Sequence, residues 1–286
     1  MSERLTKSAR VAALVKTLLD SPYVMLSVSD LAEDFAVAKS SLSEDLAAVR
    51  TAFDKLQLGK LETLAGASGG IRYIPRRSSA HLAAMVDALC GRLSDVSRVV
   101  PGGYLYAADI LSDPAFLFGL GEGIAGLYDG NRVDAVVTVE TRGIPLAMSV
   151  ARFLGSSLVI ARREVLFSPD GKALPLTREE SYVAEGPTIS ITFVSGSHSG
   201  VQSMSLPRKV LPQGARVLVV DDFLRGGGTM RGLLDLLAEF NAEVLGTVVL
   251  MDAIKPKKKL VSVYKSVVEV GHLEGVPVVR PGSILR

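Results

Sequence analysis

The chain has 286 residues, 48% of them apolar, so it can bury a large core and has room for two domains. Its net charge of +2 gives no general basic field, so any nucleic-acid binding must come from local patches. One cysteine and three scattered histidines exclude an internal disulfide and a cysteine-rich zinc site. The N-terminus lacks a signal-type apolar core and no run of about 18 apolar residues occurs, so we expect a cytoplasmic protein that does not enter membranes.

The first 56 residues predict three helices. Apolar residues at helical spacing begin after Thr6 and stop at Ser21-Pro22, and Ser29 is the expected N-cap of a short second helix. The third helix, from Ser40 to Leu56, has the clearest apolar periodicity in the chain. Three helices with a short turn before the last form a helix-turn-helix, which places its last helix in the major groove of DNA.

Two short strands follow, Lys60–Leu64 and Gly70–Ile74, around a small flexible tip that is typical of the wing of a winged helix. Short polar side chains let a helix approach bases, and Lys and Arg neutralise phosphates. The alternative is a domain for dimerisation or protein contacts, since acids and bases are about equally common there. The predicted contacts to double-stranded DNA are Lys39, Ser40, Ser43, Arg50, Lys60 and Arg72.

The polar segment Pro75–Ser79 breaks the strand pattern and predicts a boundary between domains at residues 1–76 and 77–286. Strands and helices then alternate from residue 133 to 253, which predicts an α/β fold with a doubly wound, mostly parallel sheet and ligands at the carboxyl ends of its strands. The expected strands are Val133–Val139, Leu158–Ala161, Thr188–Val194, Val217–Val220 and Val244–Met251.

The strand Val217–Val220 ends in two acids and a glycine-rich turn that opens a helix. Backbone N–H groups at such a turn bind phosphate. Asp221 and Asp222 repel phosphate, but they can accept hydrogen bonds from vicinal hydroxyls or hold a divalent cation. A sugar phosphate satisfies both halves; the alternative is a strand–turn–helix corner that only needs glycine. No Lys precedes Thr229, so the turn is not a Walker A loop.

This segment resembles the signature of type I phosphoribosyltransferases, in which the acids bind the ribose hydroxyls of phosphoribosyl pyrophosphate (PRPP) and the next loop binds its 5'-phosphate. The resemblance also implies a pyrophosphate loop after Val139, where Arg142 and the N–H groups of a helix start suit a diphosphate; a surface salt bridge is the alternative for Arg142. Arg162 and Arg163 either lie near the same anion or face solvent. The implied ribose and 5'-phosphate residues are Asp221, Asp222, Phe223, Leu224, Arg225, Gly226, Gly227, Gly228 and Thr229, and those for pyrophosphate are Glu140, Thr141, Arg142 and Gly143.

Nearly the whole chain resembles the Gram-positive type of purine operon repressor, a winged helix followed by a phosphoribosyltransferase-like domain. That family implies a homodimer, PRPP as an inducer that weakens DNA binding, a guanosine alarmone as a competing ligand, and no transferase activity. Tyr104 matches a family tyrosine near the site, whereas Arg225 and Gly226 replace the expected Lys-Ala. The resemblance rests on domain order, the 221–229 signature, Gly103–Ile110, Ser195–Ser197, Met204–Leu206 and the wing Ala65–Pro75.

The expected function is therefore a repressor of purine synthesis genes whose effector site binds PRPP, with or without Mg²⁺, and holds no catalytic residue and no resident metal. After Met251 the sequence has no aromatic residue that is obviously placed to stack on a nucleobase, and the nearest candidates for stacking are Phe223 and Tyr264. The segment Lys255–Lys259 is expected to be a solvated loop. One alternative is an active purine phosphoribosyltransferase with an appended N-terminal interaction domain. Another is a sugar-phosphate-binding module that regulates other proteins.

Overall fold

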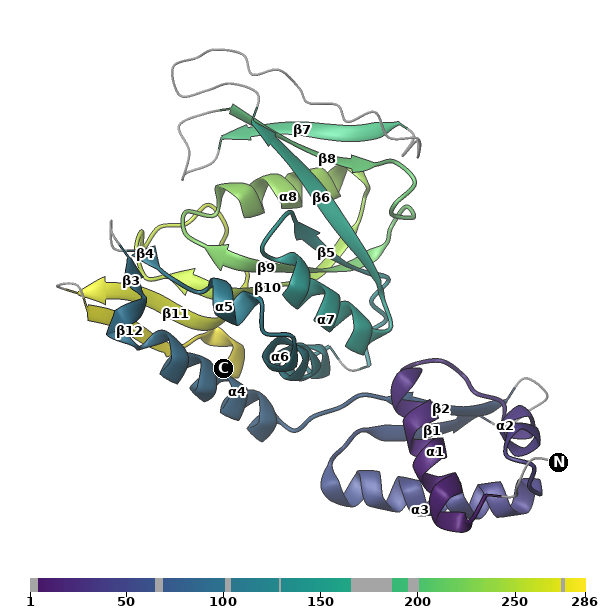
Figure 1. Ribbon diagram of the computed structural model, residues 1–286. Coiled ribbons are helices and arrows are strands. Elements are labelled where there is room, and N and C mark those ends of the chain that lie inside the picture. Colours follow the sequence, from purple (N-terminus) through teal and green to yellow (C-terminus); the bar gives the residue numbers. More distant parts are fainter. Residues whose placement is uncertain are drawn as a thin grey trace.

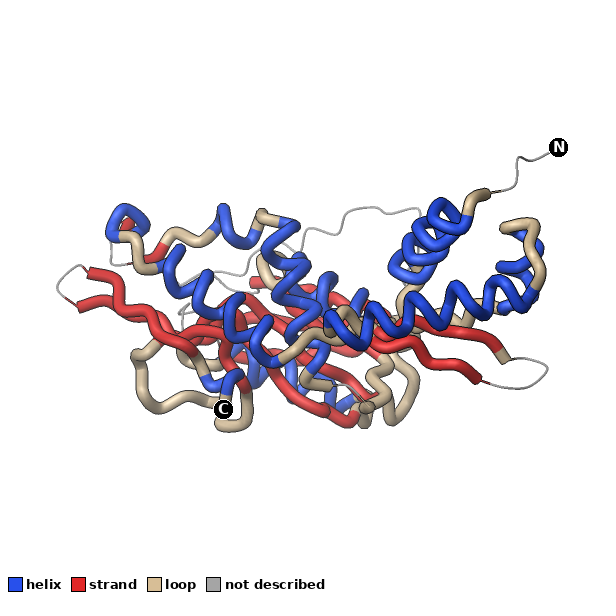
Figure 2. Tube along the Cα trace, turned by 90° about the horizontal axis from the view of Figure 1, so that it is seen from below, coloured by secondary structure: helices blue, strands red, loops and turns tan. Residues whose placement is uncertain are grey.

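The computed structural model describes residues 5–64, 69–100, 104–128, 130–165, 187–194, 201–273 and 276–286. The wing tip, the pattern Ser195–Ser197 and most of the long segment between residues 165 and 201 lie outside the described residues. In both views the N-terminal helices and hairpin lie at one end of the molecule, joined by a linker to a larger part built on a sheet (Figures 1 and 2).

The N-terminal part contains three helices and an antiparallel hairpin, as predicted. Thr6 caps the first helix by accepting a hydrogen bond from the Ala9 N–H. Ser27, and not Ser29, caps the second, because the Ser27 side chain accepts from the Asp30 N–H and the helix starts at Val28. The elements are α1 (Lys7–Asp20), α2 (Val28–Asp34), α3 (Lys39–Leu56), β1 (Lys60–Leu64) and β2 (Gly70–Ile74).

One buried ion pair crosses the core of this part. Arg10 on α1 donates from Nε to Oδ2 of Asp45 on α3 at 2.5 Å. The Asp45 side chain has no exposed surface, and its Oδ1 has no hydrogen-bond partner among the described residues. The surrounding side chains are apolar, including Leu14, Leu42 and Phe53. The pair therefore fixes α1 against α3 in a setting where neither charge can be hydrated.

The larger part is built on an eight-stranded sheet in the order β12-β11-β10-β9-β5-β6-β8-β7. The five strands from β11 to β6 are parallel, and antiparallel strands flank them at both edges. The strands are β5 (Ala135–Val139), β6 (Ser157–Val165), β7 (Thr188–Val194), β8 (Val201–Pro207), β9 (Arg216–Leu224), β10 (Glu243–Ala253), β11 (Lys265–Leu273) and β12 (Val276–Pro281).

Helices cover both faces of the sheet (Figure 1). Successive residues of β9 alternate between the two cores: Leu218 and Val220 pack with α4, α6 and α7, whereas Val217 and Val219 pack with α8. The predicted doubly wound fold is confirmed, because helices cover both faces of a mostly parallel sheet. The helices of this part are α4 (Ser79–Leu93), α5 (Ala108–Leu111), α6 (Pro114–Gly126), α7 (Ile144–Leu154) and α8 (Gly228–Glu239); short 3-10 helices span Val96–Arg98 and Ser283–Leu285, and β3 (Val99–Val100) pairs with β4 (Tyr104–Leu105).

This winding creates a switch point between neighbouring strands. β5 and β9 are adjacent and parallel, but the chain leaves β5 for α7 on one face and β9 for α8 on the other. The carboxyl ends of the two strands therefore lie at the position where doubly wound folds bind ligands. Both predicted anion loops begin at these two strand ends.

Breaking the buried pair is expected to destabilise the N-terminal part. Asp45→Ala leaves the Arg10 guanidinium buried without a partner, which costs about 3–5 kcal/mol. Asp20→Ala is the matched control, because Asp20 pairs with Lys16 on the surface, where such pairs contribute about 0–1 kcal/mol. Urea unfolding followed by circular dichroism checks this, and equal midpoints for the two variants would contradict it.

Candidate functional site

The first half of the site is the loop that joins β9 to α8. Gly227 has φ +82°, in the left-handed region that favours glycine, and precedes the first helical residue without any side-chain cap. The N–H groups of the first turn of α8 are therefore available to an anion, which the helix dipole also attracts. The Gly226 carbonyl accepts from the Leu260 N–H at 2.9 Å, which holds the loop open. Arg225 is exposed beside it.

The two acids lie near the carboxyl end of β9, directly before this loop. Asp221 and Asp222 retain only 7% and 8% of their surface, and Oδ1 of Asp221 accepts from the Asp222 N–H at 2.9 Å. Burial, and secondarily the charge of Asp222, raises the pKa of the Asp221 carboxyl. Oδ2 of Asp222 has no hydrogen-bond donor among the described residues. Buried carboxylate oxygens without donors suit a ligand that brings hydroxyl groups.

The second half of the site is the loop Glu140–Gly143 between β5 and α7. Oε1 of Glu140 accepts from the Arg163 N–H at 2.9 Å, and the peptide bond between Glu140 and Thr141 is cis. Nε of Arg142 lies 3.2 Å from Oδ2 of Asp222, while most of the Arg142 side chain faces solvent. Arg142 therefore bridges the two halves and can still rotate toward a bound anion.

Gly143 brings the halves into contact. A Cβ atom built on Gly143 would lie 2.6 Å from Oδ1 of Asp221 and 2.5 Å from Oγ1 of Thr138, closer than side chains can approach. The loop backbone can pack against the acid-bearing strand only because this residue has no side chain. The two loops, predicted from separate stretches of sequence, thus lie side by side.

The remaining predicted effector residues differ in their placement. Phe223 is partly exposed beside the acids, whereas the Leu224 side chain is buried in the core under α8, so only its backbone can meet a ligand. Arg163 lies close enough to favour the ionised form of Asp221. Arg162 is its exposed neighbour on β6, and adjacent strand residues point to opposite faces. Tyr104 is the first residue of β4. Its side chain lies outside the described part of the structure, so its contact with the effector stays a prediction.

One polar cluster beside the site was not predicted. Lys259 was expected in a solvated loop, but its side chain is only 7% exposed, pairs with Asp252 and donates to the Ala253 carbonyl at 2.6 Å. The hydroxyl of Tyr264 donates to Oδ2 of Asp252 at 2.9 Å, and burial raises the pKa of that tyrosine. Asp252 pairs in register with Leu224, so the cluster holds the segment after β10 close to the loop between β9 and α8. Its spacing of seven and twelve residues follows no period, so the sequence carries no signal for it.

The predicted DNA-contact residues lie on α3 and the hairpin. Lys39, Ser40 and Ser43 are exposed in the first turns of α3, where a recognition helix meets base edges. Arg50, farther along the helix, donates from Nη2 to Oγ1 of Thr63 at 2.5 Å and so ties α3 to the hairpin.

The basic residues of the hairpin share one carboxylate. Glu62 lies directly across from Arg72 and two residues from Lys60 on the same face. Its oxygens accept from Lys60 Nζ at 2.9 Å and from Arg72 Nη2 and Nε at 2.7 and 2.9 Å. These two cations hold the pKa of Glu62 below its usual range. Each predicted phosphate contact of the hairpin is thus already paired with an internal anion.

Within the described ranges there is no helix long and apolar enough to span a membrane, and no cluster of three potential metal-ligating His, Cys, Asp or Glu residues.

Comparisons with known proteins divide the chain in the same way. Residues 6–75 match the family "Bacterial purine repressor, N-terminal", and residues 107–278 match "Phosphoribosyl transferase domain". The "Probable purine biosynthesis transcriptional regulator PurR" of Streptococcus pneumoniae is 38% identical over 95% of this chain and 93% of its own. The "Purine biosynthesis transcriptional repressor PurR" of Bacillus subtilis is 37% identical over 98% and 94%, and the "Purine biosynthesis transcriptional activator PurR" of Lactococcus lactis is 34% identical over 94% and 93%.

The raised pKa of Asp221 predicts a pH-dependent cost of the empty site. Because the folded protein binds this proton more tightly than the unfolded chain, stability falls as pH rises from the unfolded pKa toward the folded one. Asp221→Asn removes the cost, so its free energy of unfolding should exceed that of the wild type by an amount that grows between pH 5 and pH 7, to about 1–3 kcal/mol, and its Tm should rise accordingly. Differential scanning calorimetry without ligand checks this. Asp235→Asn, an exposed residue of α8, is the control, and a gain that is equal at both pH values would refute the assignment.

Proposed function

The chain belongs to the family of Gram-positive purine biosynthesis transcriptional regulators, and from that premise we propose that it represses purine synthesis genes and is released from DNA by PRPP. The winged helix, residues 1–76, binds the operator, and residues 77–286 form the effector domain. The protein acts as a cytoplasmic homodimer, which suits an operator with two half-sites.

The packing of Gly143 on Asp221 is the observation that carries the effector assignment. It joins two buried acids, a loop with Arg142, and the free N–H groups at the start of α8. PRPP has the matching groups: vicinal ribose hydroxyls, a pyrophosphate and a 5'-phosphate. Oδ2 of Asp222, which forms an ion pair with Arg142 but accepts no hydrogen bond among the described residues, accepts a ribose hydroxyl. Glu140–Gly143 bind the pyrophosphate, and Arg225–Thr229 bind the 5'-phosphate.

Other ligands of the same chemistry compete for these positions. A guanosine alarmone carries a diphosphate and a ribose, so it occupies the same anion loops. Mg²⁺ accompanies PRPP if the carboxylate and pyrophosphate oxygens together complete its octahedral shell. Measuring the affinity for PRPP with and without Mg²⁺ tests whether the ion accompanies it.

Loss of transferase activity fits the surroundings of the acids. Tyr264, an aromatic that was a candidate for stacking on a base, is hydrogen-bonded to Asp252 within the polar cluster. Phe223 is the remaining exposed aromatic beside the acids among the described residues. A sensor needs the PRPP subsites only, whereas a transferase must also hold and orient a nucleobase.

The central test is operator affinity with and without PRPP. DNA fragments from upstream of purine synthesis genes should bind the wild type, and saturating PRPP should weaken that binding. Asp221→Ala should abolish the response, because the site loses one of its two carboxylates and the hydrogen bond that Asp221 accepts from the Asp222 N–H, whereas Asp235→Ala should keep it. Fluorescence anisotropy at fixed salt measures both. Unchanged operator affinity at saturating PRPP would reject the inducer role, and tighter binding would indicate an activator-type response.

Turnover separates the sensor from the enzyme. Incubation with PRPP and the common purine bases should release no pyrophosphate above the background of Asp221→Ala. Appreciable nucleotide formation would instead support an active purine phosphoribosyltransferase with an appended domain.

The pairing of Glu62 predicts that this residue limits DNA affinity. Glu62→Gln frees Lys60 and Arg72 for phosphates, so binding to operator and to unrelated DNA should both tighten. The slope of log K against log salt should become steeper by up to about 0.9 for each phosphate gained. Glu239→Gln at the end of α8 is the control for net charge. Equal affinities and slopes for the two variants across three salt concentrations would count against the assignment.

A further inference from the structure

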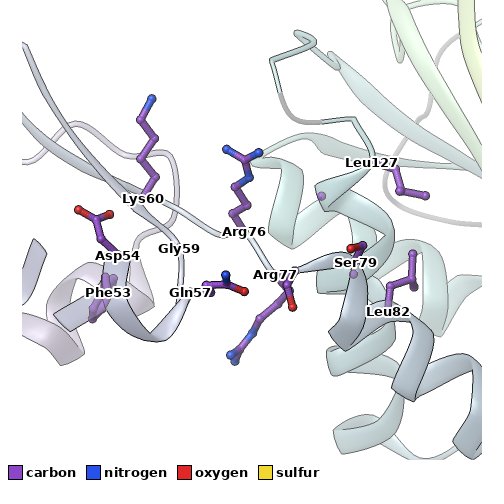
Figure 3. A pocket seen from close by; sticks show the side chains of 13 residues that line it. Phe53, Asp54, Gln57, Gly59, Lys60, Arg76, Arg77, Ser79, Leu82 and Leu127 are labelled. Carbon is purple, nitrogen blue, oxygen red and sulfur yellow. The ribbon is translucent and has the colours of Figure 1, made fainter. Parts of the chain in front are cut away.

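The two parts of the molecule meet through a loosely packed junction. No described helix or strand of the N-terminal part packs broadly against one of the larger part. A cavity of about 670 Å³ lies between them, lined by the end of α3, the linker, and residues of α4 and α6. Figure 3 shows Lys60 and Arg76 pointing to one side of this cavity and Arg77 to the opposite side. An open junction leaves the orientation of the winged helix to a few discrete contacts.

The first of these contacts is an ion pair from the linker to α6. Nε of Arg77 donates to Oε2 of Glu122 at 2.8 Å. The Glu122 side chain is only 8% exposed, so the pair is held in a largely dry setting and sets the position of the linker directly after the hairpin.

The second contact joins the winged helix to the end of α7. A Cβ atom built on Gly155 would lie 2.9 Å from Cβ, Cγ and Cδ2 of Tyr23, so the tyrosine lies directly on the glycine backbone. The Tyr23 N–H donates to the Tyr73 carbonyl at 2.8 Å, which fixes Tyr23 to β2. Gly155 has φ +63° and ends α7 as its left-handed C-cap.

Both contacts belong to a helix pair that starts at the pyrophosphate loop. α7 begins immediately after Gly143 and ends at Gly155, and an eleven-residue helix spans about 16 Å. α6 is fixed to it, because a Cβ atom on Gly121 would lie 2.7 Å from Cβ of Ser149. A buried, closely packed helix moves as a unit, so a displacement at its first turn reaches its last.

From this arrangement we infer that Tyr23 and Arg77 are positioning residues, which transmit occupation of the pyrophosphate loop to the winged helix through α7 and α6. The inference rests on the proposed function, since it names the route by which PRPP alters DNA binding. An anion bound at Thr141–Gly143 shifts the start of α7, the shift reaches Gly155 and Glu122, and the winged helix is re-oriented at Tyr23 and Arg77. Neither residue touches the effector or is a predicted DNA contact.

The test uses the full-length protein and the ratio of operator Kd with and without PRPP. In Tyr23→Ala and Arg77→Gln the direct affinities for PRPP and for operator should stay within about twofold of the wild type. The ratio of the two operator Kd values should fall toward one from the roughly 5- to 150-fold that is typical of allosteric coupling. By reciprocity, the effect of operator on PRPP affinity should fall equally.

Two glycine variants guard against a folding artefact. Gly155→Ala forces Tyr23 away and should also change the ratio. Gly214→Ala carries the same backbone cost at φ +70° with no atom within 4 Å of the new Cβ, so it should keep the wild-type ratio.

The outcomes separate the two proposals. A wild-type ratio of one would reject the inducer role and, with it, this route. A wild-type ratio above one that persists unchanged in Tyr23→Ala, Arg77→Gln and Gly155→Ala would reject the route alone. Loss of the ratio in Gly214→Ala as well would attribute the effect to general destabilisation and also overturn it.

Discussion

The close approach of the Gly143 backbone to Asp221 is the constraint on which the rest of the effector site depends. It exists because β5 and β9 are adjacent parallel strands whose connections leave toward opposite faces of the sheet. Their neighbouring carboxyl ends bring together the loop Glu140–Gly143 and a pair of acids that are 78 residues apart in sequence (Gly143 to Asp221). The same contact sets the start of α7, so the geometry of the two loops also determines the position of this eleven-residue helix.

Charged side chains have opposite surroundings in the two parts of the molecule. In the effector site the acids are buried without enough donors, which destabilises the empty protein and favours a ligand that supplies hydroxyls. On the wing the cations are satisfied by Glu62, which stabilises the free hairpin and opposes DNA. A regulator needs both: an effector site that favours occupation, and a DNA surface whose affinity is moderate enough for the effector to change.

The sequence predicted those features that depend on local pattern. The limits of the two wing strands and the helix after the triple glycine follow from alternation and glycine placement, and the structure matches them. The strand predicted at Val217–Val220 is present but longer, because β9 continues through both acids to Leu224. Features that depend on long-range packing were missed. The burial of Lys259 and the pairing of Tyr264 require β10 and the following segment to meet. β12 forms one edge of the sheet and β8 lies next to the other edge, where the apolar pattern is weak. The contact of Tyr23 with Gly155 joins residues 132 apart and leaves no periodic trace.

The two glycines that bound α7 also restrict its length. Each full turn takes 3.6 residues, so one inserted or deleted residue would rotate Gly155 by about 100° around the helix axis and move it by about 1.5 Å along it. Met148 and Arg152 are exposed on the outer face of this helix, so we expect substitutions there to matter less than a change in the residue count between Gly143 and Gly155. In evolutionary terms the proposed route leaves the outer face of the helix free to vary in composition, whereas a single-codon insertion or deletion there is expected to separate effector sensing from DNA release.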